Sequence, residues 1–542
     1  MQSSDTEYVD GDVVVPSTDA VLDNSKTMNY SGGQAVSSDA VSISSRREDK
    51  DKQAWVVFKN EIIRLAHTLR LKGWRRVSLD SGEQISVERL SGALTNAVYV
   101  VSPPADVVKQ STADGKKAPP KLLLRVYGPQ VEHLIDRETE LGVLRRLARK
   151  KIGPRLLGTF TNGRFEQFFN STTLTASDIR EPETSKQIAK RMRELHDGIE
   201  LLENEKDEGP AVWKNWDKWL KSAEERITAL DERMISGKLG PVRGPDDAWK
   251  TRGLICGVEW HVFKGMVEKY RKFVEEQYGG RKAIRERLVF AHNDAQYGNI
   301  LRLRPDDEKS PLMQPANEHK QLVVIDFEYA SANCPGLEFA NHFTEWTYNY
   351  HNPVAPWACD TTRYPTLEQR HRFIKAYVDH RPQFPHSNST PNLTPLATPT
   401  LHTAASSSSI VEFMLDARVP PGGWKEEEKR QQDQAEARVK ELLDETLLWQ
   451  IANSAQWVAW GIVQAKIPGF DGADESGFAE EVTAEEPGAA VNTTEEEEPE
   501  FDYLGYAQER AFFFWGDCVA MGLIKKEELP EELQSRLKIV NY

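Results

Sequence analysis

Short apolar runs and longer helical stripes alternate along the chain, and their order predicts a strand-rich first part followed by a helix-rich remainder. Near the middle, residues 288–291 and 322–325 form two apolar runs bounded by polar residues. Runs of this length and composition are typical of buried strands. The first run leads into a polar segment over 292–299, and the second ends at Asp326. We therefore expect carboxylate and amide side chains at the ends of two strands.

The strand signals are concentrated between residues 83 and 169. Two of the predicted strands, at 156–160 and 164–169, are joined across Asn162-Gly163, which is a strong hairpin signal. Helical stripes dominate after this region, and one precedes it from Trp55 onwards. The predicted fold class is α+β, with a small antiparallel-sheet lobe over 55–170 and a larger, mainly helical lobe over 171–542.

Three polar stretches interrupt this pattern. Residues 1–54 are rich in Ser, Asp, Thr and Gly, residues 381–423 in Pro, Ser and Thr, and residues 469–500 in acidic side chains. Segments of such composition bury too little apolar surface to fold. We therefore expect a disordered N-terminal tail, and two disordered insertions in the helical lobe.

Composition and charge narrow the functional classes. The 542 residues include 69 Lys and Arg against 84 Asp and Glu, a formal net charge of −15. This argues against a nucleic-acid-binding protein and is compatible with a cationic substrate. The four scattered Cys form no C-x-x-C pair, which argues against a disulfide scaffold and a zinc site. No apolar run reaches transmembrane length, so we expect a cytoplasmic protein without an integral membrane segment.

The polar segment after the first central strand has the spacing of a phosphoryl-transfer site. His292-x-Asp294-x-x-x-x-Asn299, followed by Asp326, matches the protein-kinase pattern. In that pattern one Asp accepts the proton of the attacking hydroxyl, while an Asn and a second Asp hold magnesium. We predict Asp294 as the general base and Asn299 and Asp326 as metal ligands. The alternative is a polar loop between two core strands, and the second carboxylate at a strand end makes it the weaker one.

With these residues in view, the chain resembles the choline/ethanolamine kinase family. The resemblance rests on segments 290–299 and 325–329 and on 341–346, which looks like the family's second signature. It extends, with gaps, from about residue 90 to about residue 514. It implies a two-lobed protein-kinase-like fold, ATP and Mg²⁺ as cofactors, and often a homodimer. The sequence departs from the family where Ala291 replaces a frequent Cys and where residues 336–338 read Gly-Leu-Glu instead of Gly-Phe-Asp.

The resemblance also assigns the nucleotide side of the site. Residues 91–96 form a small-residue loop whose backbone N–H groups could approach phosphate oxygens, although an ordinary hairpin turn is the alternative. Its candidate contacts are Ser91, Gly92, Leu94, Thr95 and Asn96. Arg125 matches the family's phosphate-binding Arg, with a surface Arg as the alternative. Glu138 could pair with Arg125 or be a solvated first-turn Glu, and Gln167 belongs to the hinge expected to face adenine.

Two tryptophans on one predicted helix are the candidate binding site for the alcohol. Trp457 and Trp460 lie three positions apart and share a helix face. Paired indoles can hold a quaternary ammonium through cation–π attraction, although spacing alone favours core side chains. The resemblance instead places both in the family's aromatic pocket. The other expected substrate-binding residues are Gln296, Glu345, Tyr350, Tyr503 and Tyr506.

From these observations we expect ATP-dependent phosphorylation of choline to phosphocholine, which the resemblance places at the first step of the CDP-choline route to phosphatidylcholine. The nearest alternative is ethanolamine kinase, or an enzyme with both activities, because a primary ammonium could use the same acidic and aromatic wall. An aminoglycoside-type phosphotransferase is more distant, and the Trp pair argues against it. An inactive kinase-like scaffold would have no need of the Asp294, Asn299 and Asp326 set.

Overall fold

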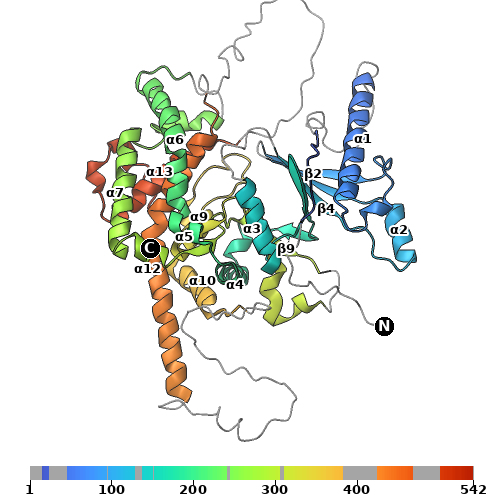
Figure 1. Cartoon of the computed structure of the whole chain (residues 1–542). Coiled ribbons are helices and arrows are strands. Elements are labelled where there is room, and N and C mark those ends of the chain that lie inside the picture. The colour runs from blue at the N-terminus through green and yellow to red at the C-terminus, as the bar shows by residue number, and fades with distance from the viewer. Residues whose placement is uncertain are drawn as a thin grey trace, which may run out of the picture. The chain divides into compact units, whose positions relative to one another are not determined.

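The computed structural model divides into two compact units (Figure 1). Unit 1 comprises Met1–Thr172, Leu303–Asp306 and Ile325–Glu328, and unit 2 comprises the rest of the chain. The chain first leaves unit 1 after Thr172, two residues beyond the boundary predicted from the sequence. The structure describes residues 15–23, 45–93, 96–127, 137–150, 152–240, 245–305, 310–382, 424–467 and 501–540. The two expected disordered insertions lie almost entirely outside these residues.

A six-stranded sheet forms the centre of unit 1, with the strand order β1-β5-β6-β4-β3-β2. All neighbouring strands in it pair antiparallel except β1, which runs parallel to β5. The predicted antiparallel sheet is therefore confirmed, apart from this one edge strand. The strands are β1 (Ser17–Thr18), β2 (Ser86–Ala93), β3 (Asn96–Ser102), β4 (Leu122–Tyr127), β5 (Leu156–Phe160) and β6 (Gly163–Gln167).

Strand β1 corrects the expectation that residues 1–54 form a disordered tail. Ser17 and Thr18 pair with the edge strand β5, whose outer backbone groups would otherwise lack strand partners. Leu22 is buried in the core of the unit, and its N–H donates to the Asn162 side chain at 2.8 Å. Helix α1 (Ser45–Thr68) also begins before residue 55. The segment thus adds a short strand to an open sheet edge and a buried side chain to the core.

Helix α1 contributes the apolar stripe that was predicted from Trp55 onwards. Trp55 and Phe58 are buried and pack against Tyr99 of β3, with the Phe58 and Tyr99 ring centroids 5.6 Å apart. The hairpin between β5 and β6 is confirmed as well. It closes at Gly163, where a Cβ atom would lie 2.4 Å from the carbonyl oxygen of Arg125. The remaining helices of unit 1 are α2 (Ala105–Ala113) and α3 (Arg137–Lys150).

Helix α12 (Trp424–Gln464) packs against α6, α9, α10 and α13, and its C-terminal half is buried in unit 2. Its buried residues include Trp449, Ile451 and Ile462. Within the described residues, no helix is both long and apolar enough to cross a bilayer. The other helices of unit 2 are α4 (Pro182–Gly198), α5 (Glu203–Glu208), α6 (Ala211–Ile235), α7 (Trp260–Tyr278), α8 (Arg281–Arg285), α9 (Pro335–Glu345), α10 (Leu367–Asp379), α13 (Tyr503–Ala520) and α14 (Glu531–Gln534).

Short strand pairs frame the central polar segment, as the two apolar runs predicted. Strand β8 (Val289–Ala291) pairs antiparallel with β11 (Ser331–Asn333), and β9 (Ile300–Leu303) pairs antiparallel with β10 (Leu322–Val324). With the short strand β7 (Ser171–Thr173), the second pair makes a sheet of order β10-β9-β7. The polar segment therefore runs from the end of β8 to the start of β9.

Candidate active site

Asp294 and Asn299 lie on the loop between β8 and β9, and the structure brings them together. Asn299 Nδ2 donates to Asp294 Oδ2 at 2.8 Å and to the Asp294 carbonyl oxygen at 3.0 Å. Asn299 is buried, whereas Asp294 is half-buried. The amide thus fixes the orientation of the carboxylate, as a positioned base requires.

Asn293 turns the chain immediately before Asp294. Its φ is +66°, in the left-handed region that Asn adopts more readily than most side chains. Its Nδ2 donates to the Tyr329 carbonyl oxygen at 2.9 Å, and its Oδ1 accepts from Asn333 at 2.7 Å. Its own carbonyl oxygen accepts from Asn341 of α9 at 3.2 Å. Buried hydrogen bonds to three neighbours therefore hold the loop in place.

Glu338 of α9 also supports the loop, at the position where the sequence departs from Gly-Phe-Asp. Its fully buried carboxylate accepts the His292 backbone N–H at 2.9 Å and forms an ion pair with His196 of α4. Burial alone would raise the pKa of Glu338, but the charge and hydrogen bond of His196 outweigh it and lower that pKa. The longer Glu side chain thus reaches the loop backbone as a charged group.

His342, one helical turn beyond Glu338 on α9, is neutral. Its Nδ1 lies 2.8 Å from the Ala295 carbonyl oxygen, which can only accept, so this nitrogen carries the proton. Nε2 is then the acceptor for the Trp346 indole N–H at 3.4 Å. Burial lowers the pKa of His342 to about 4, which keeps the ring neutral at physiological pH.

Seven aromatic side chains of unit 2 gather beside this loop, and we call them the aromatic cluster. Trp457 and Trp460 meet edge to face with their centroids 5.3 Å apart, so the predicted pair does share one face. The ring centroid of Trp460 also lies 5.6 Å from that of Tyr503 and 5.8 Å from that of Tyr506. The cluster consists of Tyr329, Tyr350, Trp457, Trp460, Phe501, Tyr503 and Tyr506.

Both indoles of the aromatic cluster are hydrogen-bonded to partners of Asn293. Trp457 donates to Asn341 Oδ1 at 2.9 Å, and Trp460 donates to the Tyr329 hydroxyl at 2.8 Å. Asn341 in turn donates to the Asn293 carbonyl, and the Tyr329 carbonyl accepts from the Asn293 side chain. The residue before Asp294 is therefore linked to each indole through one intermediate residue.

Asp294 also acts electrostatically on the cluster. The pKa of Tyr506 is raised, mainly by burial, and the negative charge of Asp294 is among the further causes. Gln296, two residues after Asp294, accepts the Gly298 N–H at 2.8 Å and so caps the short turn that carries Asn299. Asp294, its amide partner Asn299 and the aromatic cluster thus lie close together within unit 2.

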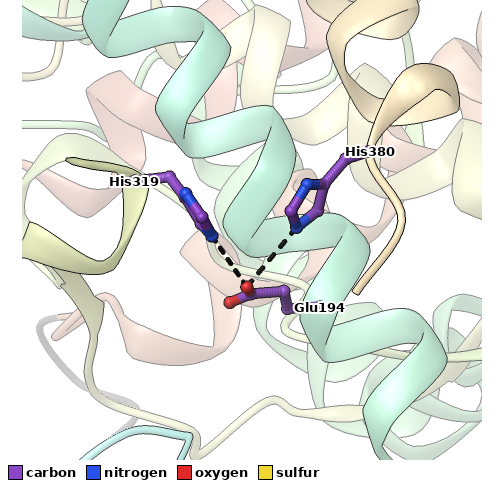
Figure 2. A group of neighbouring side chains, drawn as sticks. All are labelled: Glu194, His319 and His380. Carbon is purple, nitrogen blue, oxygen red and sulfur yellow. Dashed lines mark hydrogen bonds and ion pairs between the residues drawn. The ribbon is translucent and has the colours of Figure 1, made fainter. Parts of the chain in front are cut away.

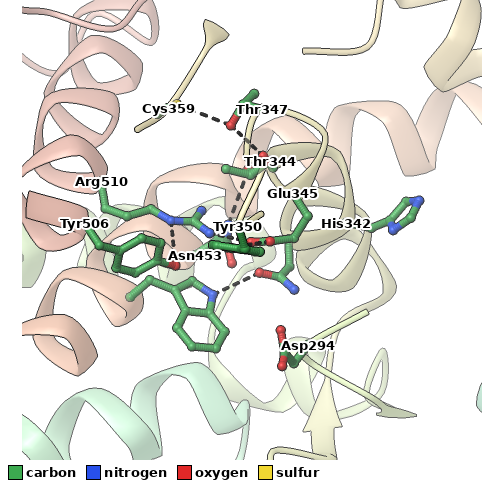
Figure 3. Close-up of polar contacts among 12 residues, drawn as sticks. Asp294, His342, Thr344, Glu345, Thr347, Tyr350, Cys359, Asn453, Tyr506 and Arg510 are labelled. Atoms are coloured by element: carbon green, nitrogen blue, oxygen red, sulfur yellow. Dashed lines mark hydrogen bonds and ion pairs between the residues drawn. The ribbon is translucent and has the colours of Figure 1, made fainter. Parts of the chain in front are cut away.

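Glu345, expected to form an acidic wall for the substrate, is instead buried and paired. Its side chain is 2% exposed, and its carboxylate forms an ion pair with Arg510 of α13 and accepts the Tyr350 hydroxyl at 2.7 Å. Figure 3 shows Arg510, Tyr506 and Tyr350 around this carboxylate. Burial and the Glu345 charge raise the pKa of Tyr350 well above its usual value. Arg510 therefore neutralises the charge that the sequence assigned to substrate attraction.

Three members of this site were not found from the sequence. Tyr329 lies three residues after the predicted metal ligand Asp326, and Phe501 lies two residues before Tyr503, so proximity to assigned residues was the available signal. Arg510 gave none, because its pairing with Glu345 spans 165 positions. Arg510 Nε also donates to the Tyr506 hydroxyl at 3.0 Å, which joins the ion pair to the aromatic cluster.

In unit 1, Arg125 and Asp326 are brought together. Arg125 Nη1 lies 3.2 Å from Asp326 Oδ1, and only 10% of the Arg125 side chain is exposed. Asp326 has a φ of +65°, a left-handed conformation that is uncommon for residues other than Gly, although Asp adopts it more readily than most. Gln167 at the end of β6 accepts the Arg155 Nε–H at 3.0 Å. Arg125 is thus a buried, paired side chain and not a surface one.

The segment expected to be a small-residue loop, 91–96, is mostly strand. Strand β2 extends to Ala93 and β3 starts at Asn96, with a register shift between Arg89 and Ser91. Leu94 and Thr95 lie outside the described residues, as do the side chains of Ser91, Asn96 and Glu138, although Glu138 lies by its backbone in α3.

Comparison with known families matches residues 87–515 to the family described as choline/ethanolamine kinase and residues 6–83 to the choline kinase N terminus. Choline kinase of Schizosaccharomyces pombe is 33% identical over 472 residues, which cover 86% of this chain and 90% of that protein. Ethanolamine kinase of Saccharomyces cerevisiae is 26% identical over 499 residues, which cover 87% and 78%.

A solved structure of choline kinase from Cryptosporidium parvum shares the fold. It matches with a TM-score of 0.50 at 19% identity, covering 85% of this chain and 97% of the other. The predicted two-lobed, protein-kinase-like fold is thereby confirmed. The family match spans most of the chain and includes the loop of Asp294, the Asp326 segment and the aromatic helices. The chain therefore belongs to the choline/ethanolamine kinase family.

Proposed function

We propose that the protein transfers the γ-phosphoryl group of ATP to the hydroxyl of choline, giving phosphocholine and ADP. The single observation that carries the choice of substrate is the aromatic cluster beside Asp294. Trp457 and Trp460 are in contact there. The π-faces of indoles can hold a quaternary ammonium, a cation that has no N–H to donate. The 33% identity to a yeast choline kinase supports the same choice.

Asp294 is the proposed general base. The choline oxygen forms a bond to the γ-phosphorus while the bond from that phosphorus to the bridging oxygen breaks, and ADP leaves. Asp294 receives the hydroxyl proton, and the Asn299 amide holds its carboxylate in position. Phosphoryl transfer depends mainly on such positioning and on stabilising charge. We assign the cationic end of choline to the aromatic cluster, with Gln296 as a further candidate contact.

The proposed Mg²⁺ ligands have the chemistry that the ion prefers. Asn299 uses Nδ2 for its hydrogen bonds, so its Oδ1 receives no donor from the described residues. Asp326 supplies carboxylate oxygens, one of which contacts Arg125. Carboxylate and amide oxygens are suitable ligands for this hard cation. When bound, Mg²⁺ would neutralise phosphate charge.

On the nucleotide side, Arg125 is proposed to contact phosphate. Its pairing with Asp326 in unit 1 supports a role near the metal–nucleotide, since Arg suits bidentate phosphate contact. The other proposed nucleotide residues are Ser91, Gly92, Leu94, Thr95, Asn96, Glu138 and Gln167. Entry of the product into phosphatidylcholine synthesis and a homodimeric state are also proposals, carried by family membership.

An ADP-release assay tests the function directly. With Mg²⁺ and ATP present, kcat/KM is measured for choline, ethanolamine and their mono- and dimethylated intermediates. A steady rise with methylation is expected, because each methyl group removes an N–H and favours an aromatic site. A preference for ethanolamine would favour the second candidate, ethanolamine kinase, which the 26% identity to such an enzyme supports. No turnover of any of these alcohols would contradict the proposal.

A further inference from the structure

Three side chains from separate segments of unit 2 converge away from the residues discussed so far. Glu194 belongs to α4, His319 to the short 3₁₀ helix η6 (Pro315–Gln321), and His380 follows α10. Figure 2 shows both imidazole rings directed at the Glu194 carboxylate. His319 Nε2 lies 2.9 Å and His380 Nε2 3.4 Å from the same oxygen, Oε1.

We propose that Glu194, His319 and His380 form a binding site for a divalent transition-metal ion, with Zn²⁺ as the best fit. Two imidazoles and one carboxylate are a donor set that zinc takes, whereas Mg²⁺ and Ca²⁺ prefer oxygen alone. The spacing of the cysteines argues only against a zinc site with Cys ligands. It says nothing about a site that consists of His and Glu.

The two nitrogen-to-oxygen separations suit tetrahedral coordination. Zinc bonds of about 2.0–2.1 Å place neighbouring ligand atoms about 3.3 Å apart in a tetrahedron. The two nitrogen-to-oxygen distances, 2.9 and 3.4 Å, bracket this value, and all three ligand atoms lie within 4.8 Å of one another. A water molecule would complete the shell as the fourth ligand.

The surroundings of Glu194 also suit a metal ligand. Its side chain is only 9% exposed and forms an ion pair with Arg191 of the same helix. Arg191 contacts Oε2 and leaves Oε1 to the histidines. The arrangement resembles metal sites in which a second partner orients a ligating carboxylate.

The competing explanation is a metal-free triad, in which both histidines donate to Glu194. A neutral histidine can donate from Nε2, so the 2.9 Å contact is compatible with it. The second contact is long for a hydrogen bond at 3.4 Å, and two donors would share one oxygen while Arg191 occupies the other. Only the metal site would bind zinc at about one ion per chain, so a measurement of bound zinc distinguishes the two explanations.

The test uses the full chain, stripped with a chelator, reloaded with Zn²⁺ and desalted before elemental analysis. About one zinc per chain is expected in the wild type, and loss of that zinc in the His319→Asn, His380→Asn double variant. His371→Asn is the matched control, because His371 pairs with Glu436 at 2.9 Å without a second histidine. This control should keep its zinc.

Spectroscopy and stability give readouts that do not depend on turnover. Co²⁺ at the site should produce the visible absorption of four-coordinate cobalt, and Zn²⁺ should displace it. Zinc should raise the melting temperature of the wild type and leave that of the double variant unchanged. Since none of the three residues is assigned to catalysis, kinase turnover with Mg²⁺ verifies that the variant is folded.

The proposal is overturned if the wild type retains no zinc after desalting, which would leave the hydrogen-bonded triad. It is equally overturned if the double variant binds as much zinc as the wild type, because the metal would then bind elsewhere. Removal of a ligand is expected to weaken zinc binding by about 10²-fold or more, beyond the usual effect of losing a supporting contact.

Discussion

The Glu338 carboxylate accepts the backbone N–H of His292 at 2.9 Å, two positions before the proposed base Asp294. Its other oxygen pairs with His196 of α4, so this buried side chain of α9 connects α4 with the loop that carries Asp294. Where the resemblance led us to expect an Asp, this chain carries Glu338, which is one methylene longer. The loop backbone is therefore hydrogen-bonded to a buried carboxylate in addition to its other contacts.

Replacing Glu338 by Gln should lower the free energy of unfolding by about 3 kcal/mol, because His196 loses a buried ionic partner. Turnover should fall as well, since the His292 N–H loses a charged acceptor. Urea denaturation and steady-state kinetics measure the two effects. A double-mutant cycle with His196→Gln should show strong coupling, and additive effects of the two substitutions would contradict the pairing.

Asp294→Asn should lower kcat by a factor of about 10² to 10⁴, which is the usual contribution of a positioned base. The choline KM should change little, because the aromatic cluster remains. Asn299→Ala provides a comparison: it removes one hydrogen bond to the Asp294 carboxylate and a proposed metal ligand, so the fall in its turnover should depend on Mg²⁺ concentration. Near-normal turnover of Asp294→Asn would refute the assignment.

Trp460 and Trp457 should respond differently to truncation. Trp460 is half-buried, so Trp460→Ala should weaken choline binding by about 1–2 kcal/mol, or 5- to 30-fold in KM, with a modest effect on stability. Trp457 is 4% exposed, and Trp457→Ala should in addition cost about 3–5 kcal/mol of folding stability. Thermal unfolding and choline titrations separate the two effects.

Trp460→Phe is the matched control, because it keeps a π-face and loses only the hydrogen bond to Tyr329. It should retain most of the affinity for choline. An unchanged choline KM in Trp460→Ala would show instead that the indole is a packing residue and that the cation binds elsewhere.

His342 predicts a pH dependence of stability. Burial lowers its pKa from the ordinary histidine value of 6.5 to about 4, so the unfolded chain binds the proton more readily. The contribution is fully present above about pH 6.5 and is lost progressively as the pH falls towards 4, at about 1.4 kcal/mol per pH unit and about 3 kcal/mol in all. Denaturant unfolding at several pH values measures it.

His342→Asn should reduce the slope of unfolding free energy against pH by the contribution of one proton. The reason is that an Asn amide can still donate to the Ala295 carbonyl but does not titrate. The comparison of the two slopes cancels the contribution of all other groups. If both proteins show the same slope between pH 4 and 6.5, His342 is not the buried neutral base described here.

Local features of the fold and site followed from the sequence. The strands around the polar segment were located to within a residue or so, and the contact between Asp294 and Asn299 could be inferred, because both depend on residues a few positions apart. The aromatic cluster was found only in part. Tyr329 and Phe501 join it through side-chain directions that spacing does not specify.

Contacts between distant segments could not be predicted. Glu338 reaches His292 across 46 positions and Arg510 reaches Glu345 across 165, and both depend on how helices pack in unit 2. Glu345 therefore looked like an exposed acid when its charge is already matched. Strand β1 was missed because its composition is polar, and an open sheet edge elsewhere in the fold decides its structure.

The hydrogen bonds of Asn293 connect the proposed alcohol site to the backbone beside Asp294. One hydrogen-bonded network, through Asn341 and Tyr329, joins this residue to both indoles. An alcohol that shifts either ring must also disturb the backbone beside the proton acceptor. A head group that fits poorly should then slow phosphoryl transfer as well as bind weakly. Discrimination among alcohols should therefore appear in the turnover rate.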